Sequence, residues 1–390
     1  MKALWLDAEW KPRPEYKLNE RERTTRRAYR GNQVYYDPKL YMTDIPAPEP
    51  SPDEVLVKVK ACGVCGSDVH FLEKEPNGYT MYPGHCKLPM VIGHEWSGVV
   101  EEVGSKVTAL KPRDRVCVEE MIWCGVCTPC RMGMVNQCED LEEIGFTVNG
   151  AFAEYVVTKP QYCWKIDSIL EAYDGDEDKA FEVGAMVEPC GVAYNAMFVR
   201  GGGIQPGGHV AVFGSGPIGL ASIGLARTSG AAKIFSFEVV PERRELAKKM
   251  GADYVFDPVQ LQEEGTDVGE MLRDITDGVG IAMSVEAAGV SPKTFPIIEQ
   301  ALAVKGKVIQ VGMGSERTPV LLVQFQYQGA SIHASVGHSG HDIFPSVIRL
   351  MAAKRLDMLP IVTARFPLDE ALEAIELTSR RVDGKVMVKP

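Results

Sequence analysis

Apolar and polar positions alternate in short runs through the first half of the chain. Residues 55–60 (Val-Leu-Val-Lys-Val-Lys) alternate strictly, which predicts a half-buried strand, and residues 97–103 and 151–157 are also strand-like. Glycine and proline interrupt this region often, as they do in loops between short strands. The first half is therefore predicted to be a β-rich domain with irregular connections.

From about residue 190 the pattern changes to apolar strands that alternate with helical stretches. The predicted elements are strands at 210–213, 233–238, 253–256, 281–285 and 307–311, and helices near 217–229 and 241–250. This βαβ rhythm predicts a parallel, doubly wound sheet, so the fold class is α/β. Two helices near 342–354 and 368–378 and a strand at 385–389 follow. We interpret this last part as a return to the first domain.

These patterns predict three segments: a β-rich domain over residues 1–195, an α/β domain over 196–337, and the return over 338–390. Two charged stretches look like insertions within them. Residues 11–31, within a wider segment 11–45, are rich in Lys and Arg, and residues 171–182, within 168–184, are acidic. Charge runs of this kind are most often solvated loops; the alternative is a subunit contact or the rim of a substrate site.

Composition narrows the class of function. The chain has 390 residues, 45% of them hydrophobic, and a net charge of −11. The negative charge argues against nucleic acid or an anionic membrane surface as a partner. No apolar run approaches the roughly 18 residues of a transmembrane helix, and the N-terminus does not resemble a signal peptide. We expect a cytoplasmic protein.

The strongest metal signal is a group of cysteines in a segment near residues 117–145, which we call the four-cysteine lobe. Cys124, Cys127, Cys130 and Cys138 follow the spacing C-x2-C-x2-C-x7-C. Four thiolates complete a closed tetrahedral zinc shell without an open position for substrate. We expect a structural zinc ion here, with a nucleic-acid-binding zinc ribbon as the less favoured alternative because the chain is acidic.

A nucleotide site is predicted in the α/β domain. Gly214-Ser-Gly216-Pro217-Ile218-Gly219 follows a predicted strand and opens a helix, and Glu238 ends the next strand. The glycines allow a tight turn and a close approach to a pyrophosphate, while an acid at Glu238 accepts ribose hydroxyls and repels a 2′-phosphate. NAD is therefore favoured over NADP. Arg243 is expected to cover the adenine, although Arg243 and Arg244 could soften the rejection of NADP.

A second metal site is predicted from residues that are scattered along the chain. Cys62 and Cys65 form a C-x2-C pair, which we interpret as a packed thiol and a ligand, respectively. His94-Glu95 offers an imidazole beside a carboxylate, and Glu188 offers another carboxylate. One thiolate, one imidazole and one carboxylate leave a position for water or substrate. Taken singly, His94 is equally well a core histidine and Glu188 a helix-start acid.

Together these motifs resemble the zinc-dependent medium-chain alcohol and polyol dehydrogenases, in family order from about Val55 to Pro390. The resemblance implies a GroES-like catalytic domain interrupted by a Rossmann domain. It also implies a catalytic zinc ion on Cys65, His94 and a third ligand. Glu188 stands where better-known alcohol dehydrogenases have a cysteine, as in the polyol branches; Cys190 is the alternative ligand. Glu95 is expected nearby, and either Glu95 or Glu188 is expected to exchange with water on the metal.

The resemblance further implies how the reaction proceeds. Zinc lowers the pKa of the substrate hydroxyl, and a hydride passes from the carbinol carbon to NAD. Ser67 matches the family's hydroxyl relay and His70 its histidine toward solvent. Asp68 is expected to accept the second N–H of His94. The expected cofactors are one catalytic and one structural zinc ion per chain, and NAD.

The substrate is predicted less sharply than the reaction. A polyol or cyclitol is expected, and the two insertion-like segments resemble a branch of inositol breakdown that acts on keto-cyclitols such as scyllo-inosose. Sorbitol, butanediol and threonine dehydrogenases remain alternatives, as does a non-catalytic zinc- and nucleotide-binding protein with a structural or regulatory role. The family resemblance implies a homodimer or homotetramer, with the apolar stretch Val320–Tyr327 as a candidate edge strand.

Overall fold

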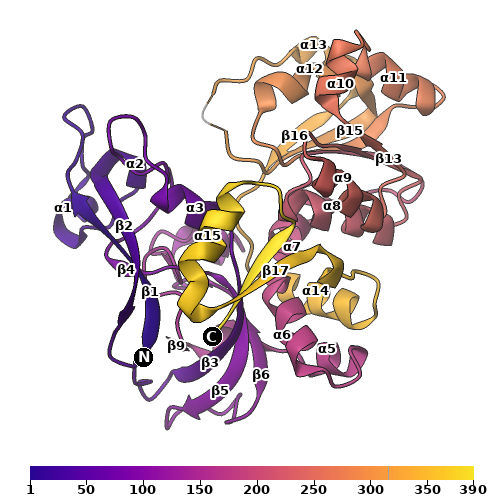
Figure 1. The fold of residues 1–390 in the computed structure, drawn as a ribbon. Coiled ribbons are helices and arrows are strands. Elements are labelled where there is room, and N and C mark those ends of the chain that lie inside the picture. The colour runs from indigo at the N-terminus through magenta and orange to yellow at the C-terminus, as the bar shows by residue number, and fades with distance from the viewer. Residues whose placement is uncertain (315) are drawn as a thin grey trace. The chain divides into compact units, whose positions relative to one another are not determined.

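The computed structural model describes residues 1–314 and 316–390, which form two compact units (Figure 1). The first unit contains Met1–Glu188 and Val362–Pro390, and the second contains Pro189–Ile361. The sequence pattern predicted the boundaries between the two domains near residues 195 and 338. The segment after residue 338 stays in the second unit, because a methyl group on Gly191 would lie 3.3 Å from the ring of Phe344.

The first unit is built on strands that pair antiparallel, except for the parallel pair β17 and β18. A seven-stranded sheet has the order β10-β6-β5-β3-β18-β17, with β9 paired to β3, and a smaller sheet has the order β2-β1-β4. The strands are β1 Lys2–Trp10, β2 Tyr35–Asp44, β3 Val55–Gly63, β4 Met90–Val91, β5 Glu95–Val103, β6 Arg115–Val118, β7 Met121–Ile122, β8 Glu142–Glu143, β9 Tyr155–Thr158, β10 Cys163–Lys165, β17 Val362–Pro367 and β18 Lys385–Lys389. The yellow C-terminal strand β18 thus returns to the early strand β3 (Figure 1).

Short helices connect and cover these strands. They are α1 Glu20–Thr25, α2 Gly31–Val34, α3 Gly66–Leu72, α4 Thr128–Arg131, α5 Asp167–Ala172, α6 Glu177–Ala185, α7 Val187–Tyr194 (which runs on into the second unit) and α15 Ala371–Ser379, with 3-10 turns at Val135–Gln137, Pro160–Tyr162 and Leu368–Glu370. Most acids of the stretch 171–182 are exposed, as expected, but the stretch is largely helical instead of a loop. It ends in α6, which packs on β3 and β5 and whose Glu182 is 3% exposed and paired with Arg365.

The second unit is a six-stranded parallel sheet in the order β13-β12-β11-β14-β15-β16. Its strands are β11 His209–Phe213, β12 Lys233–Phe237, β13 Tyr254–Phe256, β14 Ile281–Glu286, β15 Leu302–Gln310 and β16 Ser331–Ala334. The chain order reverses between β11 and β14, which is the switch point where open α/β sheets bind ligands. The glycine motif directly after β11 therefore lies at the carboxyl ends of the strands, where a ligand site is expected.

Helices cover both faces of this sheet. They are α8 Pro217–Thr228, α9 Pro241–Lys249, α10 Pro258–Glu263, α11 Val268–Ile275, α12 Ser291–Ala301, α13 Leu322–Gln328 and α14 Ile343–Ala352, with a π-helical segment at Asn195–Arg200 and a 3-10 turn at Leu359–Ile361. Phe213 and Phe235 pack with α10–α13 in one core. Val212 faces the other way, 3.5 Å from where a methyl group on Gly219 of α8 would lie. Burial on both faces explains the near-continuous apolar strands.

The predicted edge strand over Val320–Tyr327 is wrong, because these residues lead into and form most of helix α13. Within α13 only Phe325 is buried, while Leu322 and Tyr327 are 67% and 83% exposed. A short apolar run does not distinguish a strand from a helix by its periodicity. The two edge strands of the sheet are β13 and β16. None of the helices in the described part of the chain is long and apolar enough to cross a membrane.

Candidate active site and metal centres

Two neighbouring strands of the first unit bring three predicted ligand residues together. β3 ends at Gly63 just before Cys65, and His94 directly precedes β5. The strands are antiparallel and pair Gly63 with Glu95, so the end of one meets the start of the other. Ligand atoms of Cys65, His94 and Glu95 consequently lie within 4.8 Å of one another.

This trio fits a zinc ion. Thiolate, imidazole and carboxylate bind zinc at about 2.0–2.3 Å, so ligand atoms in a tetrahedral shell lie roughly 3.3–3.8 Å apart. The spacing in the structure is compatible with that shell after small side-chain movements. Since only three protein ligands are present in the trio, such a site keeps an open position. The trio therefore has the donor set of a catalytic zinc centre.

A buried lysine that the sequence did not reveal also holds Glu95. The Nζ of Lys385 lies 2.7 and 2.5 Å from the two carboxylate oxygens of Glu95, and 2.9 Å from the carbonyl oxygen of Val64. Lys385 is 1% exposed. Burial lowers the lysine pKa, but the charges of Glu95, Cys65 and Glu188 and the hydrogen bond to Glu95 together outweigh this effect, so the pKa is raised. Lys385 is therefore a cation beside the predicted zinc ligands.

Glu188 is not a member of this group within 4.8 Å. It is in the first turn of α7 and 6% exposed. Burial lowers the pKa of His94, whereas the charges of Asp68, Cys65 and Glu188 raise it, with a net rise well above the usual value. In this geometry Glu95 is the carboxylate ligand of the trio. Glu188 acts on His94 through its charge.

The helix after Cys65 supplies Asp68. One carboxylate oxygen accepts the backbone N–H of Cys65 at 2.9 Å, which fixes the turn that carries the thiol. The other oxygen lies 3.7 Å from Nδ1 of His94, beyond hydrogen-bond distance. Burial raises the pKa of Asp68 to about 6, although His94 acts in the opposite direction. Asp68 therefore orients Cys65 directly and faces His94 without a hydrogen bond.

The predicted proton relay residues lie on the same helix, α3. The hydroxyl oxygen of Ser67 is buried and has no hydrogen-bond partner among the residues that the structure describes. An orphaned buried hydroxyl is costly unless another group binds it. The imidazole of His70 is 28% exposed and contacts Glu73 at 2.8 Å. One relay group thus faces the interior and the other reaches solvent.

Aromatic rings that no sequence motif indicates pack beside His94. The ring of Phe146 lies 4.5 Å from the imidazole of His94, and Tyr82 packs 5.6 Å from Phe146. Phe71 packs 4.0 Å from Tyr82. These residues carry no spacing motif, since three separate segments supply them. They form an apolar wall beside the predicted zinc ligands.

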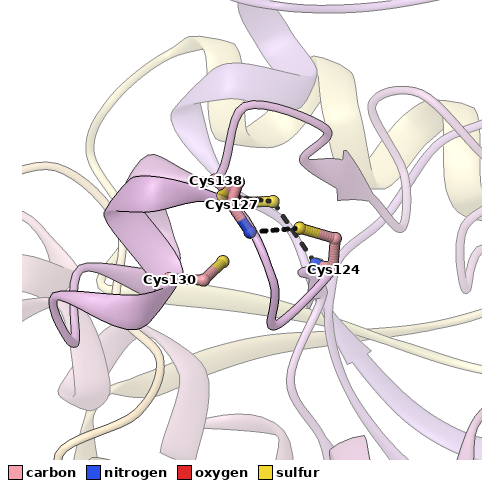
Figure 2. Close-up of side chains that lie close together, drawn as sticks. All are labelled: Cys124, Cys127, Cys130 and Cys138. Carbon is pink, nitrogen blue, oxygen red and sulfur yellow. Dashed lines mark hydrogen bonds between the residues drawn. The ribbon is translucent and has the colours of Figure 1, made fainter.

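The four predicted structural ligands form a second cluster, which Figure 2 shows in the loop around α4. The sulfurs of Cys124, Cys127, Cys130 and Cys138 lie within 4.8 Å of one another. Those of Cys127 and Cys138 are 3.9 Å apart, close to the roughly 3.8 Å between thiolates of a tetrahedral zinc site. The backbone N–H groups of Val126 and Cys127 lower the pKa of Cys124 to about 7. The cluster fits a closed zinc site.

Replacing Cys130 by Ser is expected to remove about one zinc ion per chain and to lower the thermal midpoint by several degrees, with kcat reduced less than tenfold. The reason is that a closed site contributes its binding energy to folding of the lobe. Metal analysis and calorimetry measure both effects. Cys163→Ser, at a buried thiol outside the cluster, is the control. An unchanged zinc content in the Cys130 variant contradicts the assignment.

The predicted nucleotide loop joins β11 to α8 in the second unit. Gly214 has φ +89°, a conformation that other residues rarely adopt. A methyl group on Gly219 would lie 1.9 Å from the carbonyl oxygen of Gly214. The helix then starts with Pro217 and Ile218, and its N-terminus is suited to bind a pyrophosphate. The geometry therefore requires glycine at these two positions.

Glu238 follows β12 and is tied to this loop. Its carboxylate accepts the backbone N–H of Ser215 at 2.6 Å and that of Val240 at 2.9 Å. Arg244 forms an ion pair with Asp257 at 2.9 Å. Because this carboxylate already balances its charge, Arg244 is a weak attractor for a 2′-phosphate. Arg243 lies beside the loop, 4.0 Å from a methyl group built on Gly216. The acid therefore stands where a ribose would approach.

Glu238→Ser is expected to reduce the preference for NAD over NADP, measured as the ratio of kcat/KM values, by roughly tenfold to a hundredfold. The substitution removes both the acceptor for ribose hydroxyls and the charge that repels a 2′-phosphate. Steady-state kinetics with both cofactors measures the ratio. Glu242→Gln, at an exposed acid in the first turn of α9, should leave it unchanged. A wild-type preference for NADP contradicts the role given to Glu238.

Comparison with known proteins adds to this geometry. The family described as "Alcohol dehydrogenase GroES-like domain" matches residues 51–168, and "Zinc-binding dehydrogenase" matches residues 217–353. The chain is 41% identical over 387 residues to scyllo-inosose 3-dehydrogenase of Thermotoga maritima, an alignment that covers 96% of both chains. It is 33% identical over 353 residues to human sorbitol dehydrogenase, covering 90% and 92%.

A solved structure of a protein described as an alcohol dehydrogenase from Thermotoga maritima superposes with a TM-score of 0.94. It is 39% identical and covers 100% of both chains. Together with the two family matches, this similarity confirms the predicted fold class, a GroES-like domain with a Rossmann-type α/β domain. The predicted enzyme class and the expectation of zinc and a nicotinamide cofactor are confirmed in the same way.

Proposed function

We propose, from the premise that this chain belongs to the zinc-dependent medium-chain alcohol and polyol dehydrogenase family, that it oxidises a secondary ring hydroxyl of a keto-cyclitol such as scyllo-inosose with NAD. The observation that carries the choice of substrate is the 41% identity over 96% of both chains to scyllo-inosose 3-dehydrogenase. The alignment with sorbitol dehydrogenase is weaker and covers less of this chain.

The residues of this chain would have the following roles in the reaction. Cys65, His94 and Glu95 would hold the catalytic zinc ion, which supplies Lewis-acid catalysis when bound, while NAD on the glycine loop accepts the hydride. Ser67, whose hydroxyl is buried and unpartnered among the described residues, would take the proton of the substrate hydroxyl. His70 would pass it to solvent. The products are a ketone at the oxidised carbon, NADH and a proton.

A substrate panel tests this proposal. NADH formation at 340 nm would be followed with scyllo-inosose, myo-inositol, sorbitol, 2,3-butanediol and L-threonine. We expect the highest kcat/KM for the keto-cyclitol. A higher value for an acyclic polyol or for L-threonine would overturn the choice of substrate, while the family assignment would stand.

We also propose that the enzyme works in the cytoplasm as a homo-oligomer joined through the edge strand β16. Apolar side chains on and near this edge are exposed, with Ile332 at 43% and Val336 at 53%. Exposed apolar groups of this kind mark protein interfaces. Light scattering on the purified protein is expected to give a multiple of the 42.8 kDa chain mass, and Ile332→Glu is expected to lower it.

A further inference from the structure

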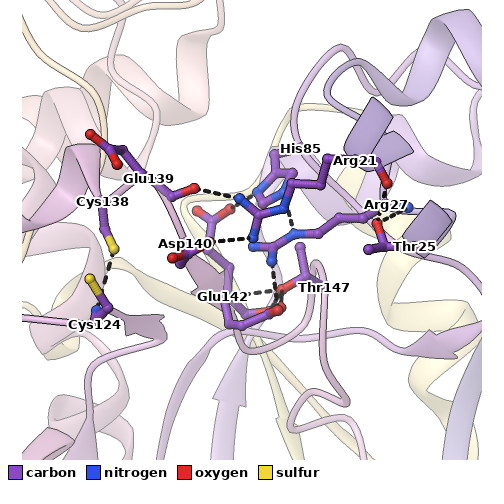
Figure 3. A network of polar contacts seen from close by, with 11 residues as sticks. Arg21, Thr25, Arg27, His85, Cys124, Cys138, Glu139, Asp140, Glu142 and Thr147 are labelled. Atoms are coloured by element: carbon purple, nitrogen blue, oxygen red, sulfur yellow. Dashed lines mark hydrogen bonds and ion pairs between the residues drawn. The ribbon is translucent and has the colours of Figure 1, made fainter. Parts of the chain in front are cut away.

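The basic N-terminal segment, residues 11–34, is attached to the four-cysteine lobe by two arginines (Figure 3). Arg21 pairs with Asp140 at 3.0 Å, two residues after Cys138. Arg27 pairs with Glu142 at 2.6 Å. Arg27 is only 5% exposed, so this contact is a buried attachment instead of a solvated one. Most Lys and Arg side chains of this segment are exposed, as expected, but Arg27 is buried and anchors the segment to the lobe.

Arg27 also fixes the protonation of His85. Its Nε–H donates to Nε2 of His85 at 2.5 Å, so that nitrogen must present a lone pair. The ring proton then lies on Nδ1, which faces a carboxylate oxygen of Glu143 at 3.2 Å. His85 therefore transmits a hydrogen bond from Arg27 to Glu143. The remaining oxygen of Glu143 makes no hydrogen bond with any described residue.

The loop that follows Glu143, the last residue of β8, also touches the predicted zinc site. The backbone N–H of Phe146 donates to the carbonyl oxygen of Glu143 at 3.1 Å, and the ring of Phe146 lies 4.5 Å from His94. A methyl group on Gly145 would lie 2.6 Å from the carbonyl oxygen of Gly93. The loop is packed this closely against the residue before His94. Glu143 consequently has a defined position relative to the predicted metal ligands.

Tyr82 places a second polar group on the same side of the aromatic wall. Burial and then the charge of Glu143 raise the pKa of its phenol well above the usual value, and Cys65 contributes in the same direction. The hydroxyl oxygen of Tyr82 lies 2.6 Å from where a methyl group on Gly84, the residue before His85, would be built, and its ring lies 5.6 Å from that of Phe146. The phenol is therefore beside the segment that carries His85 and packs on the residue that contacts His94. Its hydroxyl makes no hydrogen bond with any residue that the structure describes. A neutral phenol donor and a carboxylate acceptor are the groups that bind an alcohol.

Resting on the proposed function, we propose that Glu143 and Tyr82 bind a hydroxyl of the cyclic polyol that is remote from the carbon being oxidised. Glu143 accepts the hydroxyl proton and Tyr82 donates to its oxygen. His85 and Arg27 are positioning residues, which act through the carboxylate of Glu143. The basic N-terminal segment thereby determines specificity for polyhydroxylated rings.

Glu143→Gln tests the binding role with two substrates: the best polyol of the panel, and cyclohexanol, a secondary alcohol without a remote hydroxyl. We expect kcat/KM for the polyol to fall roughly tenfold to a hundredfold, mainly through KM, because a charged hydrogen bond is lost. Cyclohexanol turnover, zinc content and thermal midpoint should not change. Glu139→Gln, an exposed acid of the same lobe, is the matched control. An unchanged polyol KM, or an equal loss for both substrates, overturns the proposal.

A double-mutant cycle tests the positioning role. Arg27→Gln should raise the polyol KM in the wild-type background but add little in the Glu143→Gln background, since it acts through that carboxylate. Arg27→Lys should restore less than half of the loss, because it lacks the guanidinium fork. His85→Gln replaces Arg27→Gln if the latter does not fold. Additive effects overturn the positioning role. A wild-type preference for an acyclic polyol would overturn the proposed function alone, because the Glu143 comparison uses whichever polyol is best.

Discussion

Cys65→Ala is expected to leave about one zinc ion per chain instead of about two, and to lower kcat/KM by about a thousandfold or more. Lewis-acid stabilisation by a bound zinc ion is worth several kcal/mol in a transition state, and each 1.36 kcal/mol corresponds to about a tenfold change in rate. The thermal midpoint should change little, because the four-cysteine cluster keeps its own ion. Metal analysis and steady-state kinetics on one preparation measure both effects.

Cys62→Ala is the matched control for this experiment. Cys62 is three residues earlier in the chain and fully buried, and its sulfur lies 3.8 Å from the carbonyl oxygen of Gly63. Its loss should cost a little stability through a small cavity while the zinc content stays the same. If the Cys62 variant loses zinc and the Cys65 variant retains it, the two thiols have been given the wrong roles.

Local motifs explain why much of the site could be predicted from sequence. The Gly214–Gly219 loop and the four cysteines each lie within a short segment, so their spacing alone constrains the geometry. Cys65 and His94 are far apart in sequence, but each lies a few residues from a strand that the sequence pattern predicts, at 55–60 and 97–103. Pairing of these two strands then brings them together.

Long-range packing explains what the sequence did not reveal. Lys385 starts an alternating strand, where a lysine ordinarily faces solvent, and its burial depends on the pairing of β18 beside β3. Arg27 belongs to a basic run whose charges looked solvated, yet its partners His85 and Glu142 are more than 50 residues away. In both cases the composition of the local segment predicts an exposed side chain. Contacts with residues that are distant in sequence bury the side chain instead.

Lys385→Met is expected to lower the free energy of unfolding of the first unit by about 3–5 kcal/mol, because it leaves the carboxylate of Glu95 buried without its partner. Glu95 is 1% exposed and has no access to water that would compensate for the lost cation. Thermal and chemical denaturation of the zinc-depleted protein measure this cost. The double variant Lys385→Met/Glu95→Gln should recover part of it, since it buries no uncompensated charge.

The zinc-loaded form of Lys385→Met should lose less stability than the zinc-depleted form. In the wild type, Lys385 neutralises Glu95 and competes with a metal ion for both carboxylate oxygens. Once the lysine is removed, a bound cation is the remaining partner, so the metal should bind more tightly and resist a chelator for longer. A cobalt-substituted sample should report the altered coordination in its visible spectrum. Equal losses of stability with and without zinc would show that Glu95 is not a ligand, and Glu188 would then be the third ligand.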